Sequence, residues 1–300
     1  MRKEVEAVNL ARRENAVARL ACINPSSLPL LLPTARWTGA EIEGTTPIDT
    51  SIRHFSDLVD TKGLHIVELF GGIGLGVLRT ALAGGYKVHT YTYVDRDPIS
   101  RSIARVVLNG LQALYPLQLP ATATKAFDRG LPQDIAHISN NFLQQLLVDH
   151  GPVDLLGASW ECQNVSRAGH QRGAADPRFL FFYDMVRIIN YLQHKQASPM
   201  VYILENTFPG ELCTAEVNRA GKLVQSFIGA PLLIDAADLG AAAHRVRLFW
   251  TNMLPPAVLQ AALPKILPPY PSLSTILHPY HLPTMPGHND HFPFARQNRV

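Results

Sequence analysis

The chain has no long apolar segment and little charge, and each absence argues against a class of protein. No run in its 300 residues reaches the roughly 18 consecutive apolar residues of a membrane span. The first residues lack an apolar core and include Glu4, Glu6 and Glu14, which argues against a signal or transit peptide. Charged residues make up only 17%, too few for a disordered polyelectrolyte.

The sequence also lacks the spacing of a disulfide framework or a zinc site. Its three cysteines are odd in number and widely spaced, which predicts free thiols in a reducing compartment. They are Cys22, Cys162 and Cys213. Four histidines near the end of the chain lie at irregular intervals among prolines, so we interpret them as loop residues rather than metal ligands. They are His278, His281, His288 and His291.

What is present fits one α/β domain with a sizeable core. Hydrophobic residues make up 47% of the chain, and the net charge of +3 permits nucleic-acid binding without requiring it. Short apolar runs alternate with segments of helical periodicity, which predicts a doubly wound, mostly parallel sheet. Strands are expected at 64–70, 86–95, 153–157, 200–206 and 243–250, with a poorly defined one near 131–135. Helices are expected at 2–21, 77–83, 98–114, 138–149, 179–192 and, as a short one, 272–277.

Two features near the first strands predict a nucleotide-like ligand. The glycine-rich turn 71–76 joins a strand to a helix, so its backbone can approach a ligand closely. Val77 breaks the dinucleotide fingerprint, which disfavours a nicotinamide-dependent oxidoreductase. Asp95 ends the second strand, where a carboxylate can accept both ribose hydroxyl protons. The alternative is that Asp95 caps the helix that begins near Pro98.

Two further strand ends carry reactive side chains. Cys162 follows a buried strand at the sheet edge where open α/β folds place their chemistry, and a long basic loop follows it. The alternative is that Cys162 is a small buried hydrophobe. Glu205 leaves another buried strand, where an unpaired carboxylate would be costly, although a helix cap or a surface turn could explain it.

The pattern from Cys162 to about Ile189 resembles the nucleophile segment of the cytosine carbon-5 DNA methyltransferases. It reads Cys-Gln-x-x-Ser, then Ala-Gly, then Gly-x-x-Asp-x-Arg, then Leu-Phe-Phe. Phe70-x-Gly72-x-Gly74 resembles the cofactor signature of that family, and the Glu-Asn pair at 205–206 resembles its glutamate motif. The segment 243–250, Ala-His-Arg-x-Arg-x-Phe-Trp, is most similar to the animal de novo branch.

The resemblance implies an S-adenosylmethionine-dependent methyltransferase (Rossmann-like) fold and a division of roles. Cys162 would attack carbon 6 of a flipped-out cytosine, and Glu205, protonated or hydrogen-bonding, would engage ring nitrogen 3. Arg247 would contact the exocyclic oxygen of the base, and Arg245 would orient Glu205 or a phosphate. Alternation would place both arginines on one face of a strand.

The resemblance also implies a cofactor site, a partner and a compartment. The glycine turn would hold the methionine part of S-adenosylmethionine, Asp95 its ribose and Asp134 its adenine amino group. The predicted cofactor residues are Phe70, Gly72, Ile73, Gly74, Asp95 and Asp134. The predicted DNA contacts are Ser166, Arg167, Arg172 and Arg178. A partner methyltransferase subunit and a nuclear location are further expectations.

The same resemblance divides the chain into three regions. Residues 1–60 form a helix and an irregular lead-in, and 61–254 form the catalytic domain. Residues 255–300 form a proline-rich irregular tail, the start of a truncated or degenerate target-recognition region. The closing motifs of the family are not visible before Val300.

This chain departs from the family pattern at two positions. Trp160-Glu161 replaces the usual proline before the cysteine, and Ala243 replaces a glutamine. A carboxylate next to a thiol opposes the thiolate form unless cations offset it, and we expect Arg245 and Arg247 to supply that offset. Two alternatives therefore stay open: a module that binds DNA or a partner methylase without chemistry, and a methyltransferase acting on RNA.

Overall fold

The computed structural model describes residues 45–53, 62–163, 165–166, 169, 171–210, 213–239, 241 and 244–263. The predicted helices 2–21 and 272–277 lie outside the described residues. The chain divides into two compact units, one of residues 1–234 and 246–263, the other of residues 235–245 and 264–300. The fold and the sites described below belong to the first unit unless stated otherwise.

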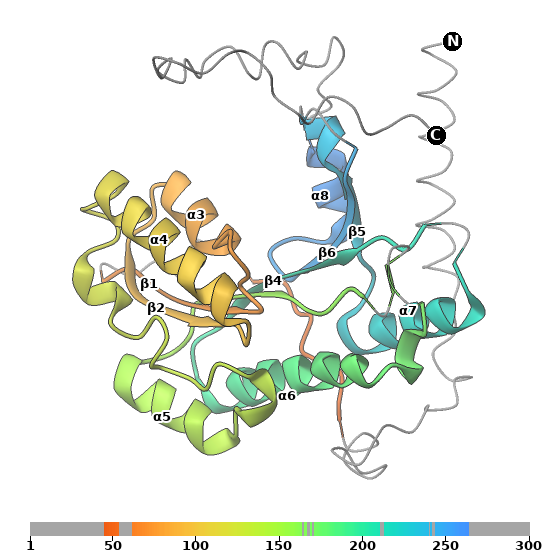
Figure 1. Ribbon diagram of the computed structural model, residues 1–300, viewed down its shortest axis with the longest axis horizontal. Coiled ribbons are helices and arrows are strands. Elements are labelled where there is room, and N and C mark those ends of the chain that lie inside the picture. Colours follow the sequence, from red (N-terminus) through yellow and green to blue (C-terminus); the bar gives the residue numbers. More distant parts are fainter. Residues whose placement is uncertain are drawn as a thin grey trace, which may run out of the picture. The chain divides into compact units, whose positions relative to one another are not determined.

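A six-stranded sheet confirms the predicted doubly wound, mostly parallel architecture (Figure 1). Its order is β2-β1-β3-β4-β6-β5. β1 pairs in parallel with β2 and with β3, and β3 with β4, whereas β6 runs antiparallel to β4. The strands are β1 (Leu64–Leu69), β2 (Val88–Val94), β3 (Leu155–Ser159), β4 (Val201–Thr207), β5 (Leu232–Asp235) and β6 (Val246–Thr251).

Helices cover both faces of this sheet, which explains the continuous apolar strands. Figure 1 shows α3 and α4 on one side and α5 and α6 on the other. Successive strand residues enter opposite cores: Leu155 packs with α3 and α4, and Leu156 packs with α5 and α6. All six residues of β1 are therefore buried. The helices are α3 (Gly76–Ala83), α4 (Pro98–Leu114), α5 (Asn140–His150), α6 (Leu180–Lys195), α7 (Ala215–Ile228) and α8 (Pro256–Ala262).

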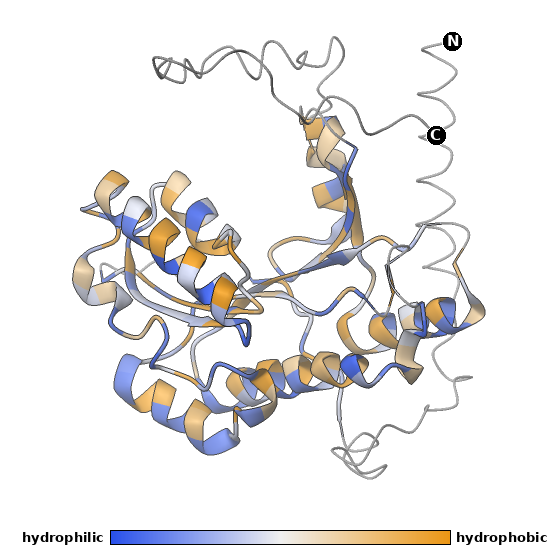
Figure 2. Ribbon diagram, in the orientation of Figure 1, coloured by the Kyte–Doolittle hydropathy of each residue, from blue (hydrophilic) through white to orange (hydrophobic). Residues whose placement is uncertain are grey.

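The helices alternate between polar and apolar residues, as expected where one face is buried. In Figure 2 the ribbon of α4 changes repeatedly between blue and orange along its length. The buried residues of α4, Ala104, Leu108 and Leu111, recur at intervals of four and three. No helix in the described ranges combines the length and hydropathy that a membrane-spanning helix needs.

The predicted strand near residues 131–135 does not form. Between α4 and α5, all of which is described, the chain has two short 3-10 helices, η3 (Ala121–Thr124) and η4 (Ile135–His137), and no strand. Pro116, Pro120 and Pro132 remove backbone donors from this stretch, which disfavours a sheet ladder. β2 is consequently an edge strand. Two of its amides, those of Val88 and Tyr93, donate to carbonyl oxygens of this connection, at 2.8 Å each.

Two helices were missed. α7 was not predicted, although Thr214 caps it through a 3.3 Å bond from the Val217 amide, and its buried residues Val217, Ala220 and Val224 recur at helical spacing. α8 lies in the segment predicted as an irregular tail, so that prediction is wrong for residues 256–262. Pro256 occupies the first turn of α8, where proline is favoured.

His65, on β1, is a buried imidazole that should make stability depend on pH. Its Nδ1 lies 3.2 Å from the carbonyl oxygens of Gly151 and Pro152, and its side chain is fully buried. Burial lowers the pKa of His65 from 6.5 to about 3, so the unfolded chain binds this proton at higher pH than the folded chain does. The free energy of unfolding should therefore fall by about 1.4 kcal/mol for each pH unit below about pH 6.

Urea denaturation at pH 7, 6 and 5 tests this expectation. His65→Asn keeps a side-chain amide near the position of Nδ1 and should remove most of the slope. His194→Asn is the matched control, because His194 is exposed on α6 and should leave the slope unchanged. An equal slope in the wild type and in His65→Asn would contradict the assignment.

Candidate active site

The turn after β1 presents its backbone to open space. Gly72 has a positive φ of 55°, and a Cβ built at Gly72 or Gly74 would meet nothing within 4 Å. Ile73, between them, is 54% exposed. This geometry agrees with the prediction that a ligand approaches the turn closely.

Residues beneath the turn hold it in place. The Tyr93 hydroxyl donates to the Gly72 carbonyl oxygen at 2.8 Å. Buried Glu68, on β1, accepts from the Tyr91 hydroxyl at 2.8 Å and from the Val77 amide at the start of α3 at 3.4 Å. Burial raises the pKa of Glu68. Glu68 was not among the predicted site residues, although a carboxylate within an apolar strand was the available signal.

Asp95 lies at the end of β2, as predicted, and is not the helix cap. Its Oδ2 accepts from the Gly72 amide at 2.9 Å, which ties the second strand to the glycine turn. Its Oδ1 accepts from the Asp97 amide at 2.9 Å. Asp97 caps α4 by accepting from the Ile99 and Ser100 amides, so the capping alternative for Asp95 is wrong.

A hollow of about 320 Å³ brings three of the predicted cofactor residues together with the predicted nucleophile, whereas Gly72, Ile73 and Gly74 do not line it. Phe70, Asp95, Asp134 and Cys162 all line it, together with Ser159 at the end of β3. Asp134 reaches it without the predicted third strand, because it caps η4 by accepting from the Ala136 amide at 2.9 Å. The carboxyl ends of β1, β2 and β3 thus meet at one site.

Cys162 lies just past β3 and is half-buried, so it is not a core residue. Its carbonyl oxygen accepts from the amides of Val165, at 3.0 Å, and Ser166, at 2.7 Å. These bonds form a tight turn directly after the cysteine. The alternative of an inert buried thiol is therefore not supported.

Glu205 is fixed by side chains from both neighbouring strands. Arg247 Nε, on β6, lies 2.9 Å from Glu205 Oε1. On the other side, the Ser159 hydroxyl donates to Glu205 Oε2, because Ser159 and Glu205 are register partners on β3 and β4. Ser159 was missed, since sequence alone does not show which residues face each other across strands. The carboxylate is connected through Ser159 to the hollow that Cys162 lines.

The predicted roles of the two arginines need correction. β6 begins at Val246, so only Arg247 lies on the strand. Arg247 also takes the orienting role at Glu205 that was predicted for Arg245. Arg245 belongs to the second compact unit, where its amide donates to Asp235 Oδ1 at 2.9 Å. Its role at a base or phosphate remains a prediction.

Arg178, whose contact with a DNA phosphate remains a prediction, is paired within its own loop. Its Nε lies 2.8 Å from Asp176 Oδ1 and its Nη2 lies 2.6 Å from Asp176 Oδ2, a bidentate pair. The same guanidinium donates through Nη1 to Gln163 Oε1, next to the cysteine. Bonding to Arg178 lowers the pKa of buried Asp176. Arg178 therefore shapes the loop from within.

The other predicted DNA contacts differ in accessibility. Arg172 is exposed, and Ser166 is half-buried, with its carbonyl oxygen accepting from the Gly169 amide at 3.0 Å. Arg167 lies outside the described residues. Contacts of these residues with DNA remain predictions.

Close packing requires two glycines in the loop that follows Cys162 and ends before α6, which we call the cysteine loop. A Cβ at Gly169 would lie 1.9 Å from the carbonyl oxygen of Gln163. A Cβ at Gly173 would lie 2.2 Å from the carbonyl oxygen of Glu216, and Gly173 has a φ of 56°. These glycines are the ones in the Ala-Gly and Gly-x-x-Asp parts of the sequence pattern, and the structure gives a physical reason for both.

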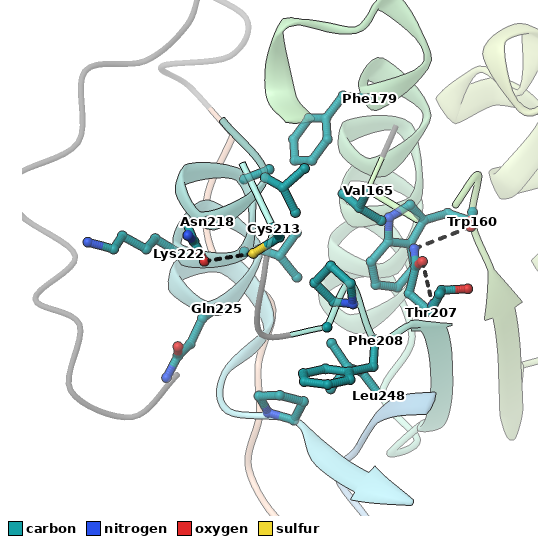
Figure 3. Close-up of a pocket in the computed structure, with 18 of the residues that line it drawn as sticks. Trp160, Val165, Phe179, Thr207, Phe208, Cys213, Asn218, Lys222, Gln225 and Leu248 are labelled. Carbon is teal, nitrogen blue, oxygen red and sulfur yellow. Dashed lines mark hydrogen bonds between the residues drawn. The ribbon is translucent and has the colours of Figure 1, made fainter. Parts of the chain in front are cut away.

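A second, mainly apolar hollow of about 360 Å³ lies behind the cysteine loop (Figure 3). Its walls come from the end of β4, α7 and β6, and include Phe208, Val217 and Leu248. Trp160 lines both hollows. Cys213 lies at this second hollow, with its sulfur 3.1 Å from Asn218 Oδ1. Cys162 and Ser159 line the first hollow and not this one, so we place the candidate chemistry at the first hollow.

No predicted residue suggested a metal centre, and in the described part of the chain no group of three His, Cys, Asp or Glu side chains is placed to hold a metal ion.

Comparisons with known proteins match this region of the chain. The model of the C-5 cytosine-specific DNA methylase family matches residues 124–260. Type II methyltransferase M.AluI of Cellulosimicrobium cellulans is 29% identical over 121 residues, which cover 39% of this chain and 22% of the relative. Type II methyltransferase M.FnuDI of Fusobacterium nucleatum is 31% identical over 96 residues, 30% of this chain and 26% of the relative. The chain therefore spans about a quarter of the length of these curated relatives.

Solved structures give weaker likenesses. The methyltransferase EhMeth of Entamoeba histolytica aligns with a TM-score of 0.40 at 14% identity, over 65% of this chain and 54% of that protein. The Dnmt2 methyltransferase of S. pombe aligns with a TM-score of 0.37 at 16% identity, over 63% of this chain and 48% of that protein.

Proposed function

We propose that this chain, whose residues 124–260 match the model of the C-5 cytosine-specific DNA methylase family, transfers a methyl group from S-adenosylmethionine to carbon 5 of cytosine in DNA. One observation carries the proposal. Cys162 lines the same hollow as Phe70 and Asp95, and Ser159 connects that hollow to the Glu205–Arg247 pair.

The residues around the hollow fit the proposed cofactor. Its volume of about 320 Å³ is in the range of small-molecule sites. Asp95 and Asp134 line it and offer carboxylate oxygens to hydroxyl and amino groups. Asp95 also binds the Gly72 amide of the neighbouring turn, whose open backbone at Gly72 and Gly74 would leave room for the methionine part. When bound, S-adenosylmethionine supplies an electrophilic methyl group.

Cys162 would act as the nucleophile. Its thiolate forms a bond to cytosine carbon 6, and the electrons of the 5,6 double bond make carbon 5 nucleophilic. After methylation, carbon 5 loses its proton to water, the double bond re-forms and the sulfur leaves with its electron pair. Because a base inside a duplex is inaccessible, the cytosine has to be flipped out, at a cost of about a few kcal/mol.

Glu205 and Arg247 would bind the ring during this step. Negative charge develops on the ring when the sulfur adds, and groups positioned in advance stabilise such charge best. Glu205 would engage ring nitrogen 3, held between Arg247 and Ser159. The described geometry makes Arg247 the residue that orients Glu205, and contact between Arg247 and the exocyclic oxygen of the base remains part of the proposal.

A binding module without chemistry is the second candidate, and Glu161 is the observation that favours it. The carboxylate next to Cys162 opposes thiolate formation. RNA stays open as the substrate, because the roles proposed for Cys162 and Glu205 involve the base and not the sugar. A nuclear location and a partner subunit stay predictions from sequence.

The proposed function is tested by trapping the covalent adduct. The protein is incubated with S-adenosylmethionine and a duplex containing 5-fluorocytosine, whose fluorine cannot leave as the proton does. We expect a complex that survives denaturation with the wild type and no such complex with Cys162→Ala. A cytosine duplex of the same sequence, with tritiated cofactor, measures turnover.

Three outcomes separate the candidates. An adduct on DNA supports the proposal, and an adduct on 5-fluorocytosine RNA alone would assign the activity to RNA. Binding of either nucleic acid without an adduct or tritium transfer, by wild-type protein shown to be folded, would favour the binding module.

A further inference from the structure

Arg96 lies at the mouth of the candidate cofactor hollow and was not among the predicted site residues. It follows Asp95 at the end of β2, and its side chain is 54% exposed. Arg101 Nη1 donates to the carbonyl oxygens of Asp95, at 2.9 Å, and Arg96, at 2.8 Å, which fixes the backbone there. The backbone that carries the Arg96 side chain is therefore fixed.

The Arg96 side chain contacts two other residues that line the hollow. Its Cζ lies 4.9 Å from the centroid of the Phe181 ring, a cation–π arrangement. Its Nη2 lies 4.0 Å from Glu161 Oε2, close enough for charge attraction but too long for a hydrogen bond. Phe181 in turn lies edge-on to Phe70, with ring centroids 6.4 Å apart.

Glu161 bears directly on the nucleophile. It precedes Cys162, and its Oε1 accepts from the amide of Gln163, the residue that follows the cysteine, at 3.3 Å. One carboxylate oxygen is thus bound to the loop backbone on the far side of Cys162, and the other faces Arg96. Arg178 is a second cation near Glu161, but it is already paired with Asp176 and Gln163.

Arg245 and Arg247 were expected to offset the charge of Glu161. Arg247 is paired with Glu205 instead, and an effect of Arg245 on Glu161 remains a prediction. In the described part of the chain, Glu161 is the one carboxylate that forms a salt bridge with Arg96.

We propose that Arg96 is a positioning residue that compensates the charge of Glu161 beside Cys162 and so maintains the reactivity of the sulfur. The inference rests on the proposed function for its purpose, because only a reactive Cys162 benefits from it. It also explains how this chain can tolerate a carboxylate where the family pattern has proline.

Alkylation of Cys162 tests the inference without cofactor or nucleic acid. Iodoacetamide labelling is followed by peptide-resolved mass spectrometry between pH 6 and 9, so that Cys22 and Cys213 are measured separately. The proteins are the wild type, Arg96→Gln, Arg96→Lys, Glu161→Gln and the double variant Arg96→Gln/Glu161→Gln. Glu161→Gln keeps an oxygen that can accept from the Gln163 amide.

The expected result is a non-additive pattern. Arg96→Gln should slow labelling of Cys162 about threefold to fivefold at pH 7.5, in the range of an exposed ion pair. Arg96→Lys should restore most of the rate because it keeps the charge. In the Glu161→Gln background, Arg96→Gln should slow labelling less than about twofold, because no carboxylate remains to be compensated.

Two results would overturn the inference: no slowing in Arg96→Gln, or equal slowing in both backgrounds. Unchanged labelling of Cys213 and an unchanged melting temperature show that the variants are folded. Labelling needs no methyl transfer, so it can be measured even if the protein proves not to be a methyltransferase. Conversely, the adduct test does not depend on whether Arg96 compensates Glu161.

Discussion

Arg247→Ala is expected to slow methyl transfer by about a hundredfold to a thousandfold. The physical reason is that Arg247 Nε holds Glu205 Oε1 at 2.9 Å, while its Nη1 is itself anchored on the Val246 carbonyl oxygen at 2.8 Å. Without the guanidinium, the Ser159 hydroxyl is the partner that Glu205 keeps among the described side chains. A carboxyl group free to rotate no longer stays in position as charge develops on the ring.

Single-turnover methylation of a cytosine duplex measures this loss of rate. A double-mutant cycle then tests whether Arg247 acts through Glu205. Glu205→Gln should cost about as much as Arg247→Ala, and the double variant should be little slower than either, because the two side chains act as one unit. Ser159→Ala, which removes the weaker partner, should cost about tenfold or less. Additive losses in the double variant would show that Arg247 acts elsewhere, for example on the exocyclic oxygen of the base alone.

Gly173→Ala is expected to lower the free energy of unfolding by about 2–4 kcal/mol and to displace the cysteine loop. Two costs combine at this position. Gly173 has a φ of 56°, and a Cβ there would lie 2.2 Å from the carbonyl oxygen of Glu216, a backbone atom in the first turn of α7. The loop is further tied to α7 by the Thr214 hydroxyl, which donates to the Gln171 carbonyl oxygen at 2.9 Å.

Gly85→Ala is the matched control for backbone strain without a clash. Gly85 has a φ of 80°, and a Cβ there would meet nothing within 4 Å. We expect a loss of about 1 kcal/mol in that variant, measured by urea denaturation beside Gly173→Ala. If the two variants lost equal stability, the contact with α7 would have no measurable role. The rate of Cys162 labelling in Gly173→Ala then reports whether the loop has moved.

The parts of the fold that depend on local pattern were predictable. The helix expected at 98–114 forms over those residues, with Asp97 as its cap. The expected strands at 64–70 and 200–206 form as β1 and β4, because buried parallel strands are short apolar runs. Cys162 and Asp95 follow from the same logic, since each lies just beyond a strand end and lines the common hollow, whereas Asp134 lines it from the cap of η4.

The parts that depend on pairing across the sheet were not predictable. Ser159 and Arg247 flank Glu205 only because β3, β4 and β6 are neighbours, which the order of the chain does not show. Arg178 looks like a free basic loop residue in sequence, but it pairs with buried Asp176. A single sequence shows the sign of the charge at such a position but not which residue pairs with it, and the pairing residue determines the role.

The strand expected near residues 131–135 does not form, and its absence has a consequence for how the molecule avoids self-association. An edge strand offers unpaired amides and carbonyls on which another chain can add by β-pairing. Here the connection after α4 uses its Gln118 and Phe127 carbonyl oxygens to occupy amides of Val88 and Tyr93, near the two ends of β2. Proteolytic nicking of that connection would uncover a strand rich in β-branched and aromatic residues, Val-His-Thr-Tyr-Thr-Tyr-Val, and convert a protected border into an aggregation site.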